Sequence, residues 1–185
     1  MAKVHNNIFV RGLTGAVGDQ FVIRKGKNGE TIVSNKPKFS DDRQFNQNQL
    51  DHQETFRHAI AYAQSVKDDE LYIKKAAGTN MNPFNAAVAD FFGEPRILEI
   101  DASEWQGQPG KVIWVQAEDD TLVTKVHVTI SDQNGAVLEE GNAQRAAALW
   151  WTYTANTQVA MEPKPHVLVT AFDQPGNSAE MVWEN

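Results

Sequence analysis

Cysteine is absent from this chain of 185 residues. Its absence excludes disulfides, thiolate metal sites and cysteine nucleophiles, so packing alone must hold the fold together. The sequence also lacks any run close to the roughly 20 apolar residues that a membrane-crossing helix needs. Its first residues, MAKVHNNIFV, have neither the apolar stretch nor the cleavage site of a secretory signal. We therefore expect a soluble protein without a membrane span that is cytoplasmic, or is exported by a route without a classical signal peptide.

The net charge of −7 conceals opposite balances at the two ends of the chain. Residues 1–40 hold seven basic against two acidic residues, a net charge of +5, whereas residues 96–185 hold five against thirteen, a net charge of −8. A basic segment can form a surface that binds an acidic partner or nucleic acid, but it is more often a solvated hairpin whose edge lysines prevent pairing with other strands. A protein partner is favoured over nucleic acid, and the candidate interacting side chains are Arg11, Arg24, Lys25 and Lys27.

Short strands and turns are predicted for residues 8–37. Asn28-Gly29 separates two apolar runs, and both residue types tolerate the positive φ angles of a tight hairpin turn. Strands are expected at 8–10, 20–24 and 31–33, with the glycine-spaced segment GLTGAVGD between the first two as turns. The N-terminal part of the chain is therefore a small β-element.

Three helices are predicted between Pro37 and Pro95. Ser40 can cap the first helix, and Asp41 and Asp42 suit the positive end of its dipole. A second helix should span 68–77 and a third should begin at Asn82-Pro83, with Gly93 ending it. The apolar residues predicted to form buried stripes at helical spacing are Phe56, Ala59, Ile60 and Ala63 in the first helix and Phe84, Ala87, Val88 and Phe91 in the third.

After Pro95 the apolar period changes to two, which predicts about seven strands. The expected strands are 97–100, 111–117, 122–131, 136–139, 149–155, 167–172 and 181–183. Alternation within them assigns to the core Val126, Val128, Ile130, Leu149, Trp151, Tyr153, Val167, Val169 and Ala171. The predicted fold class is α+β, with an N-terminal β-hairpin and three-helix module over 1–95 and an antiparallel β-sandwich over 96–185.

Two sets of motifs resemble known bacterial proteins. The runs VTKVHVTISDQNGAVLEEG, LWWTYTA and HVLVTAFDQPGNSAEMVW are similar to an immunoglobulin-like or fibronectin-type-III-like domain. The N-terminal half resembles a group of uncharacterised bacterial proteins through Gly12-Leu13-Thr14-Gly15, Val17-Gly18-Asp19, Arg24, Lys36-Pro37 and Ala89-Asp90-Phe91-Phe92. This resemblance implies an Ig-like sandwich and no particular activity, because a fold alone does not define a function.

Candidate metal ligands are the carboxylates of Glu118, Asp119 and Asp120, with Asp173 at one end of the same predicted sandwich. Acidic loops between strands bind calcium in some sandwiches, but the sequence lacks an EF-hand pattern and such loops are often merely solvated. His52 and His58 lie six residues apart, which places them about 120 degrees apart around a helix and so unlike a zinc pair. Gly12, Gly15 and Gly18 match no phosphate-binding motif and indicate turns.

Trp150 and Trp151 are adjacent in a predicted strand, so one must point into the sandwich and the other outward. We assign Trp150 to the candidate interaction sites. An outward tryptophan is typical of an interface or of stacking on sugar rings, although the N-terminal half of the same chain could also cover it.

No set of residues combines the spacing and the chemistry that a reaction needs, so the sequence predicts a non-catalytic protein without a cofactor. An Ig-like domain without an export signal is familiar from phage particles and contractile injection devices. The leading hypothesis is a structural or interaction protein that is a component or cargo of such a particle. The alternative is a module that binds glycan or calcium through the outward tryptophan or the acidic loop.

Overall fold

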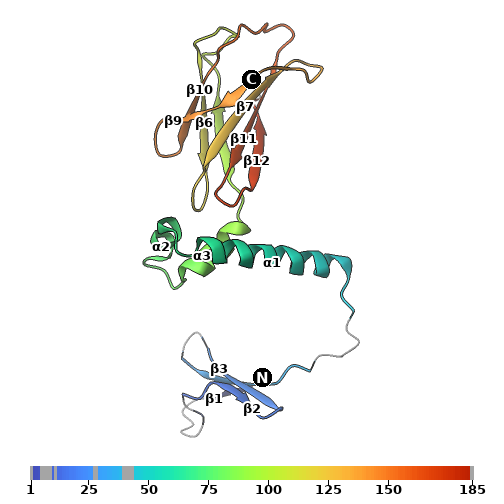
Figure 1. Ribbon diagram of the computed structural model, residues 1–185, viewed down its shortest axis with the longest axis vertical. Coiled ribbons are helices and arrows are strands. Elements are labelled where there is room, and N and C mark those ends of the chain that lie inside the picture. Colours follow the sequence, from blue (N-terminus) through green and yellow to red (C-terminus); the bar gives the residue numbers. More distant parts are fainter. Residues whose placement is uncertain (1, 5–9, 11, 27–28, 39–43, 184–185) are drawn as a thin grey trace. The chain divides into compact units, whose positions relative to one another are not determined.

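The computed structural model describes all residues except 1, 5–9, 11, 27–28, 39–43 and 184–185 (Figure 1). Within the described part, antiparallel sheets and three helices make an α+β protein. Two compact units divide the chain, Met1–Gln49 and Leu50–Asn185. Apart from the first three residues of α1 (Gln47–Val66), the helices therefore share a unit with the C-terminal sheets, whereas the sequence predicts a boundary at Pro95.

The first unit contains a four-stranded antiparallel sheet with the order β1-β4-β3-β2. Its strands are β1 (Ala2–Val4), β2 (Gly15–Val17), β3 (Phe21–Lys25) and β4 (Thr31–Asn35). Lys25 pairs with Thr31, and Gly29 has a φ of 76°, so the hairpin predicted at Asn28-Gly29 is confirmed although Asn28 itself is outside the described residues. The strand predicted at residues 8–10 also lies largely outside the described residues. The segment GLTGAVGD, which is predicted to form turns, contains β2.

Helix α1 (Gln47–Val66) begins with a reciprocal cap. The Asn46 side chain accepts a hydrogen bond from Gln49 N at 2.9 Å, and the Gln49 side chain accepts one from Asn46 N at 3.1 Å. Such a capping box satisfies two backbone donors that have no partner within the helix. The cap predicted at Ser40, with Asp41 and Asp42, lies outside the described residues.

The stripe predicted for α1 is correct for Ala59 and Ala63, which are fully buried. It is wrong for Phe56 and Ile60, whose side chains are 45% and 41% exposed. Ala63 belongs to the buried cluster formed with the other helices, whereas Phe56 and Ile60 lie outside that cluster. Phe56 instead stacks on Phe92 at the helix surface, with ring centroids 6.4 Å apart.

The other two helices follow the predicted signals. Helix α2 spans Glu70–Ala76, and α3 spans Pro83–Phe91 with Asn82 as its cap. The Asn82 side chain accepts a hydrogen bond from Asn85 N at 2.8 Å, and Pro83 occupies the first turn, where a missing N–H costs nothing. Ala63, Tyr72, Ala76, Ala86 and Ala87 form the buried cluster of the helices.

Eight strands in the described chain after Pro95 form two antiparallel sheets, β5-β6-β10-β9 and β12-β11-β7-β8. Their bounds are β5 Arg96–Asp101, β6 Val112–Glu118, β7 Lys125–Ser131, β8 Val137–Asn142, β9 Gln144–Arg145, β10 Trp150–Thr154, β11 His166–Phe172 and β12 Ser178–Val182. Alternate residues of both sheets enter one core cluster. Figure 1 shows the two layers running along each other.

The core contains most of the residues that the period of two predicts. Val126, Val128, Ile130, Val167, Val169 and Ala171 are fully buried, and Trp151 and Tyr153 nearly so. Leu149 is the exception at 37% exposed, because it precedes the first residue of β10 and therefore lies outside the pleat. Trp105, which the pattern did not place, is fully buried in the loop between β5 and β6.

Glu139 of β8 connects one loop to the C-terminal sheets by hydrogen bonds. Its carboxylate accepts hydrogen bonds from Tyr153 Oη at 2.8 Å, Asn156 N at 2.6 Å and Thr157 N at 3.0 Å. Desolvation alone would raise the pKa of Glu139, but these donors outweigh it and lower the pKa. Gly141, two residues on, leaves room for the Tyr153 ring, since a Cβ there would lie 2.9 Å from Tyr153 Cε2.

We expect Glu139→Gln to lower the free energy of unfolding by about 1–3 kcal/mol at neutral pH, because it weakens hydrogen bonds to a charged acceptor. A lowered pKa gives stability that is complete above the ordinary pKa of the carboxyl and is lost as the pH falls through the folded-state pKa. Urea unfolding at several pH values should therefore show that the free energies of unfolding of the native protein and of Glu139→Gln become equal at acidic pH. Glu140→Gln, on the exposed side of the same strand, is the matched control, and an equal effect of the two substitutions would contradict this role.

Candidate functional site

Asp90 is a fully buried carboxylate at the end of α3, where the helices meet the C-terminal sheets. Its Oδ2 accepts a hydrogen bond from Tyr72 Oη at 2.6 Å, and the Tyr72 and Tyr62 hydroxyls are 2.5 Å apart. Desolvation, and then the hydrogen bond to Asp90, raise the pKa of Tyr72 well above its ordinary value. Tyr72 is therefore a neutral donor that holds the buried charge.

Lys75 supplies the positive charge opposite Asp90. Its Nζ lies 3.3 Å from Asp90 Oδ1 and 3.0 Å from Asp120 Oδ2, and it is hydrogen-bonded to the Thr121 hydroxyl. The same hydroxyl is hydrogen-bonded to Asp90 Oδ1. We call Tyr62, Tyr72, Lys75, Asp90 and Thr121 the Asp90 network. It joins all three helices to the loop before β7.

Asn177 makes a second polar connection between the helices and the sheets. Its Nδ2 donates to the carbonyls of Phe91 at 3.2 Å and Gly93 at 2.7 Å, which are left open where α3 ends. Asp173 orients it by accepting hydrogen bonds from Gly176 N at 2.8 Å and Asn177 N at 2.6 Å. Burial raises the pKa of Asp173, since desolvation outweighs these donors.

The predicted calcium ligands are only partly brought together. Asp119 and Asp120 can place carboxylate oxygens within 4.8 Å of one another and of Asp90. Glu118 instead pairs with Arg96 at 2.6 Å, and Asp173 holds its own turn. Sequence reasoning missed Asp90, although it lies three residues after Ala87 on the apolar stripe of α3, where an acid is unexpected.

The environment of this acidic group is that of an ion pair within the protein. Asp119 Oδ2 accepts hydrogen bonds from Thr121 N and Leu122 N, both at 2.8 Å. Lys75 Nζ lies beside Asp90 and Asp120, where a bound cation would also be placed. A calcium ion would therefore have to displace the ammonium group or share its ligands against charge repulsion.

Trp150 and Trp114 form an edge-to-face pair on the outer surface of the sheet β5-β6-β10-β9, with ring centroids 6.3 Å apart. Trp151 is 6% exposed, so the prediction that one of the two adjacent tryptophans points inward and the other outward is confirmed. Trp114 is 42% exposed. The pair thus presents aromatic surface at the middle of the sheet.

The basic residues predicted to interact with a partner belong to the first unit by their position in the sequence. Arg24 and Lys25 are exposed at the end of β3, while Arg11 and Lys27 are outside the described residues. Among the helices of the described chain, none is long and apolar enough to span a membrane.

No protein-family model matches this chain, and no curated protein matches it. Among solved structures it is similar to an engineered protein, with 22% identity and a TM-score of 0.34 over 58% of this chain. The match covers 27% of that protein's length. A likeness of this extent establishes neither a fold nor a function.

Because the Lys75 ammonium already lies beside Asp90 and Asp120, where a cation would bind, we expect millimolar Ca²⁺ to leave the melting temperature of the native protein unchanged. A ligand that binds only the native state must raise that temperature. Lys75→Met removes the ammonium group and should lower the melting temperature in the absence of calcium, since it leaves Asp90 buried without its counter-ion. Differential scanning calorimetry measures both melting-temperature effects, that of calcium and that of Lys75→Met, with Lys74→Met at an exposed position as the control. A calcium-dependent rise in the native protein would restore the metal-site interpretation.

Proposed function

We propose that this protein is a non-catalytic structural or interaction protein, whose N-terminal sheet binds a partner while the C-terminal unit acts as a rigid body. The narrower proposal is that the partner is a phage-like or contractile injection particle, of which the chain is a component or cargo. One observation carries the proposal, the apolar surface of the N-terminal sheet.

That sheet exposes more large apolar side chains than it buries. Val17 and Phe21 of its strands are 51% and 41% exposed, and Leu13, just before β2, is 49% exposed, whereas Ile23, at 7%, is the one large apolar side chain buried among the described residues of this unit. A small sheet needs an apolar face packed against another surface to be stable. Exposed apolar residues on such a sheet are typical of an interface.

The charge of the same unit favours an acidic partner. Arg24 and Lys25 are exposed on β3, the strand that begins with the apolar Phe21. Basic groups beside an apolar patch give an interface both orientation and a faster association with a negatively charged partner.

The strand order of the C-terminal sheets supports the further proposal that they form an Ig-like sandwich. The order β5-β6-β10-β9 corresponds to the A-B-E-D sheet of that architecture, and β12-β11-β7-β8 corresponds to G-F-C with an added C′ strand. Domains of this kind occur with many unrelated functions, so the architecture supports a rigid scaffold rather than a particular activity.

The carboxylates buried in the described chain also support a structural role. Asp90 is held by Tyr72 and Thr121, and Asp173 by the turn at Gly176 and Asn177. Hydrogen bonds within the protein occupy them, and catalysis would need such groups to be directed at a substrate.

Sedimentation of lysate from the source cell at physiological salt, followed by detection of the chain, tests the particle hypothesis. We expect the protein to co-sediment with a megadalton particle, and Val17→Asn to reduce the sedimenting fraction at least severalfold because it places an amide in the apolar interface. Val182→Asn is the matched control, since Val182 of β12 is similarly exposed at 46%. A free monomer or small oligomer would contradict the particle hypothesis, and equal loss in both variants would contradict the role of the N-terminal sheet.

The Trp114–Trp150 pair favours a second candidate function, a glycan-binding module. Aromatic rings stack on the apolar faces of sugars, and polar Gln116 and Thr152 lie on the same outer face of β6 and β10. Titration with cello- and chito-oligosaccharides, followed by tryptophan fluorescence, should then show saturable changes that Trp150→Ala abolishes and Leu98→Ala does not. Unchanged fluorescence with both sugars would remove this alternative for those two classes.

A further inference from the structure

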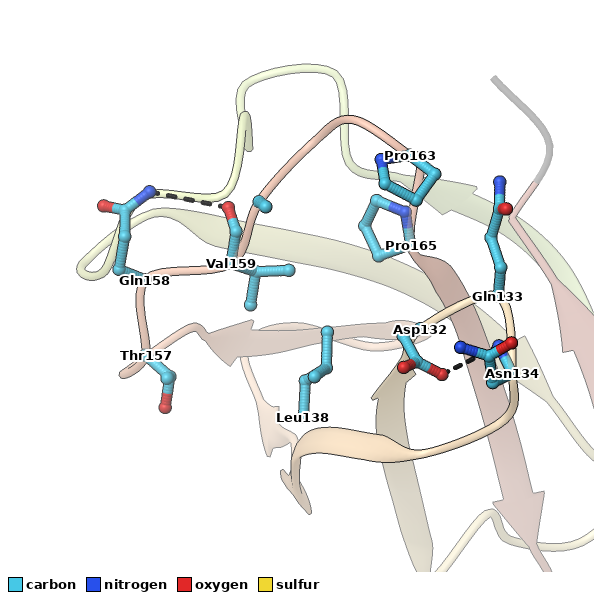
Figure 2. A pocket seen from close by; sticks show the side chains of 10 residues that line it. Asp132, Gln133, Asn134, Leu138, Thr157, Gln158, Val159, Pro163 and Pro165 are labelled. Atoms are coloured by element: carbon cyan, nitrogen blue, oxygen red, sulfur yellow. Dashed lines mark hydrogen bonds between the residues drawn. The ribbon is translucent and has the colours of Figure 1, made fainter.

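A hollow of about 380 Å³ opens at one end of the C-terminal sheets (Figure 2). It lies between the turn that joins β7 to β8 and the loop that follows β10. We call it the end hollow. Its volume is within the range of small-molecule sites, about 300–1,000 Å³.

The walls of the end hollow are largely apolar. Leu138 forms one wall, and Val159, Pro163 and Pro165 lie across from it in Figure 2. Leu138 is 42% exposed although it belongs to a strand, so its side chain is available to a ligand. Apolar walls of this kind bind the hydrocarbon part of a ligand.

One end of the hollow carries a negative charge. Asp132 is the single charged side chain among the described residues that line it. Its Oδ1 accepts hydrogen bonds from Asn134 N and Ala136 N, both at 2.8 Å, and the bond from Ala136 is the main cause that lowers the pKa of this carboxyl. A carboxylate has about four acceptor positions, so Asp132 keeps capacity for a further donor.

Both walls are held in place without a ligand. In the turn, Asp132 N donates to Ala136 O at 2.9 Å, and Gly135 N donates to Asp132 O at 3.1 Å. In the loop, Thr157 N donates to Glu139 Oε2 at 3.0 Å, and Val159 N donates to Gly107 O at 2.8 Å. A preformed site loses little conformational entropy when it binds, which favours a genuine binding site over a surface irregularity.

We propose that the end hollow binds a small organic cation, an ammonium group carried on a ring or short hydrocarbon chain. The hydrocarbon packs against Leu138, Val159 and the two prolines, and the ammonium donates to the Asp132 carboxylate. The side-chain amide of Asn134 lies near that carboxylate in Figure 2, and its oxygen can accept another ammonium hydrogen. This site is separate from the N-terminal sheet, so its test does not depend on the proposed interaction.

Three probes of one shape and different charge test this assignment: benzylammonium, benzyl alcohol and benzoate. In ¹H–¹⁵N spectra of the full chain, we expect benzylammonium to cause saturable shifts in the turn 132–138 and the loop 157–165. Asp132→Asn should weaken its binding about tenfold, the loss of one charge-assisted hydrogen bond, while benzyl alcohol is unaffected. Asparagine keeps the acceptor that the turn needs, so the fold is retained.

Two further variants complete the design. Leu138→Asn should weaken benzylammonium and benzyl alcohol alike, because it removes an apolar wall without changing the charge. Asp101→Asn is the matched control, since Asp101 likewise accepts a backbone hydrogen bond, from Ser103 N at 3.0 Å, but lies outside the hollow. Absence of saturable shifts in the hollow, binding of benzoate as tight as that of benzylammonium, or equal effects of Asp132→Asn and Asp101→Asn would overturn the proposal.

Discussion

The buried carboxylate of Asp90 is the constraint on which the second unit depends. A carboxylate that is 1% exposed is costly to bury unless donors and a counter-ion surround it, and these groups come from a helix and from a loop of the sheets. Tyr72 and Lys75 belong to α2, and Thr121 lies in the loop before β7. Satisfying one charge thus fixes the position of the helices against the sheets. The short segment Gly93-Glu94, followed by the buried Pro95, leaves little chain between them.

This arrangement explains why the proposed interaction surfaces lie where they do. The second unit holds the carboxylates of Asp90, Asp173 and Glu139 in internal hydrogen-bond networks. What it presents outward is the tryptophan pair on one sheet and the end hollow at one end. The N-terminal sheet differs, because Ile23 is its one large apolar side chain that is buried among the described residues, so it has almost no core of its own. A partner would supply the missing packing.

The sequence predicted the parts that follow from local periodicity and turn chemistry. Alternation placed Val126, Val128 and Ile130 in the core, and Asn82-Pro83 marked the start of α3, because both patterns depend on near neighbours in the chain. Prediction from the sequence failed where contacts between distant parts of the chain determine which residues are buried. Phe56 fits the helical stripe but is 45% exposed, because its one ring neighbour in the described chain, Phe92, is itself at the surface. Asp90 can be buried because Lys75, 15 residues away, supplies a counter-ion and Thr121, 31 residues away, a hydrogen bond. The end hollow could not be predicted either, as it forms between two loops that are distant in the sequence.

Chemical unfolding of the full chain, followed by two signals at once, tests the central claim that Asp90 joins helices and sheets into one cooperative body. All five tryptophans lie after Pro95 and report on the sheets, whereas far-ultraviolet circular dichroism reports mainly on the helices. The two transitions should coincide in the native protein. In Asp90→Ala they should separate, with the helices unfolding first at a stability about 3–5 kcal/mol lower. Separate transitions in the native protein, or coincident and unshifted transitions in Asp90→Ala, would contradict the claim.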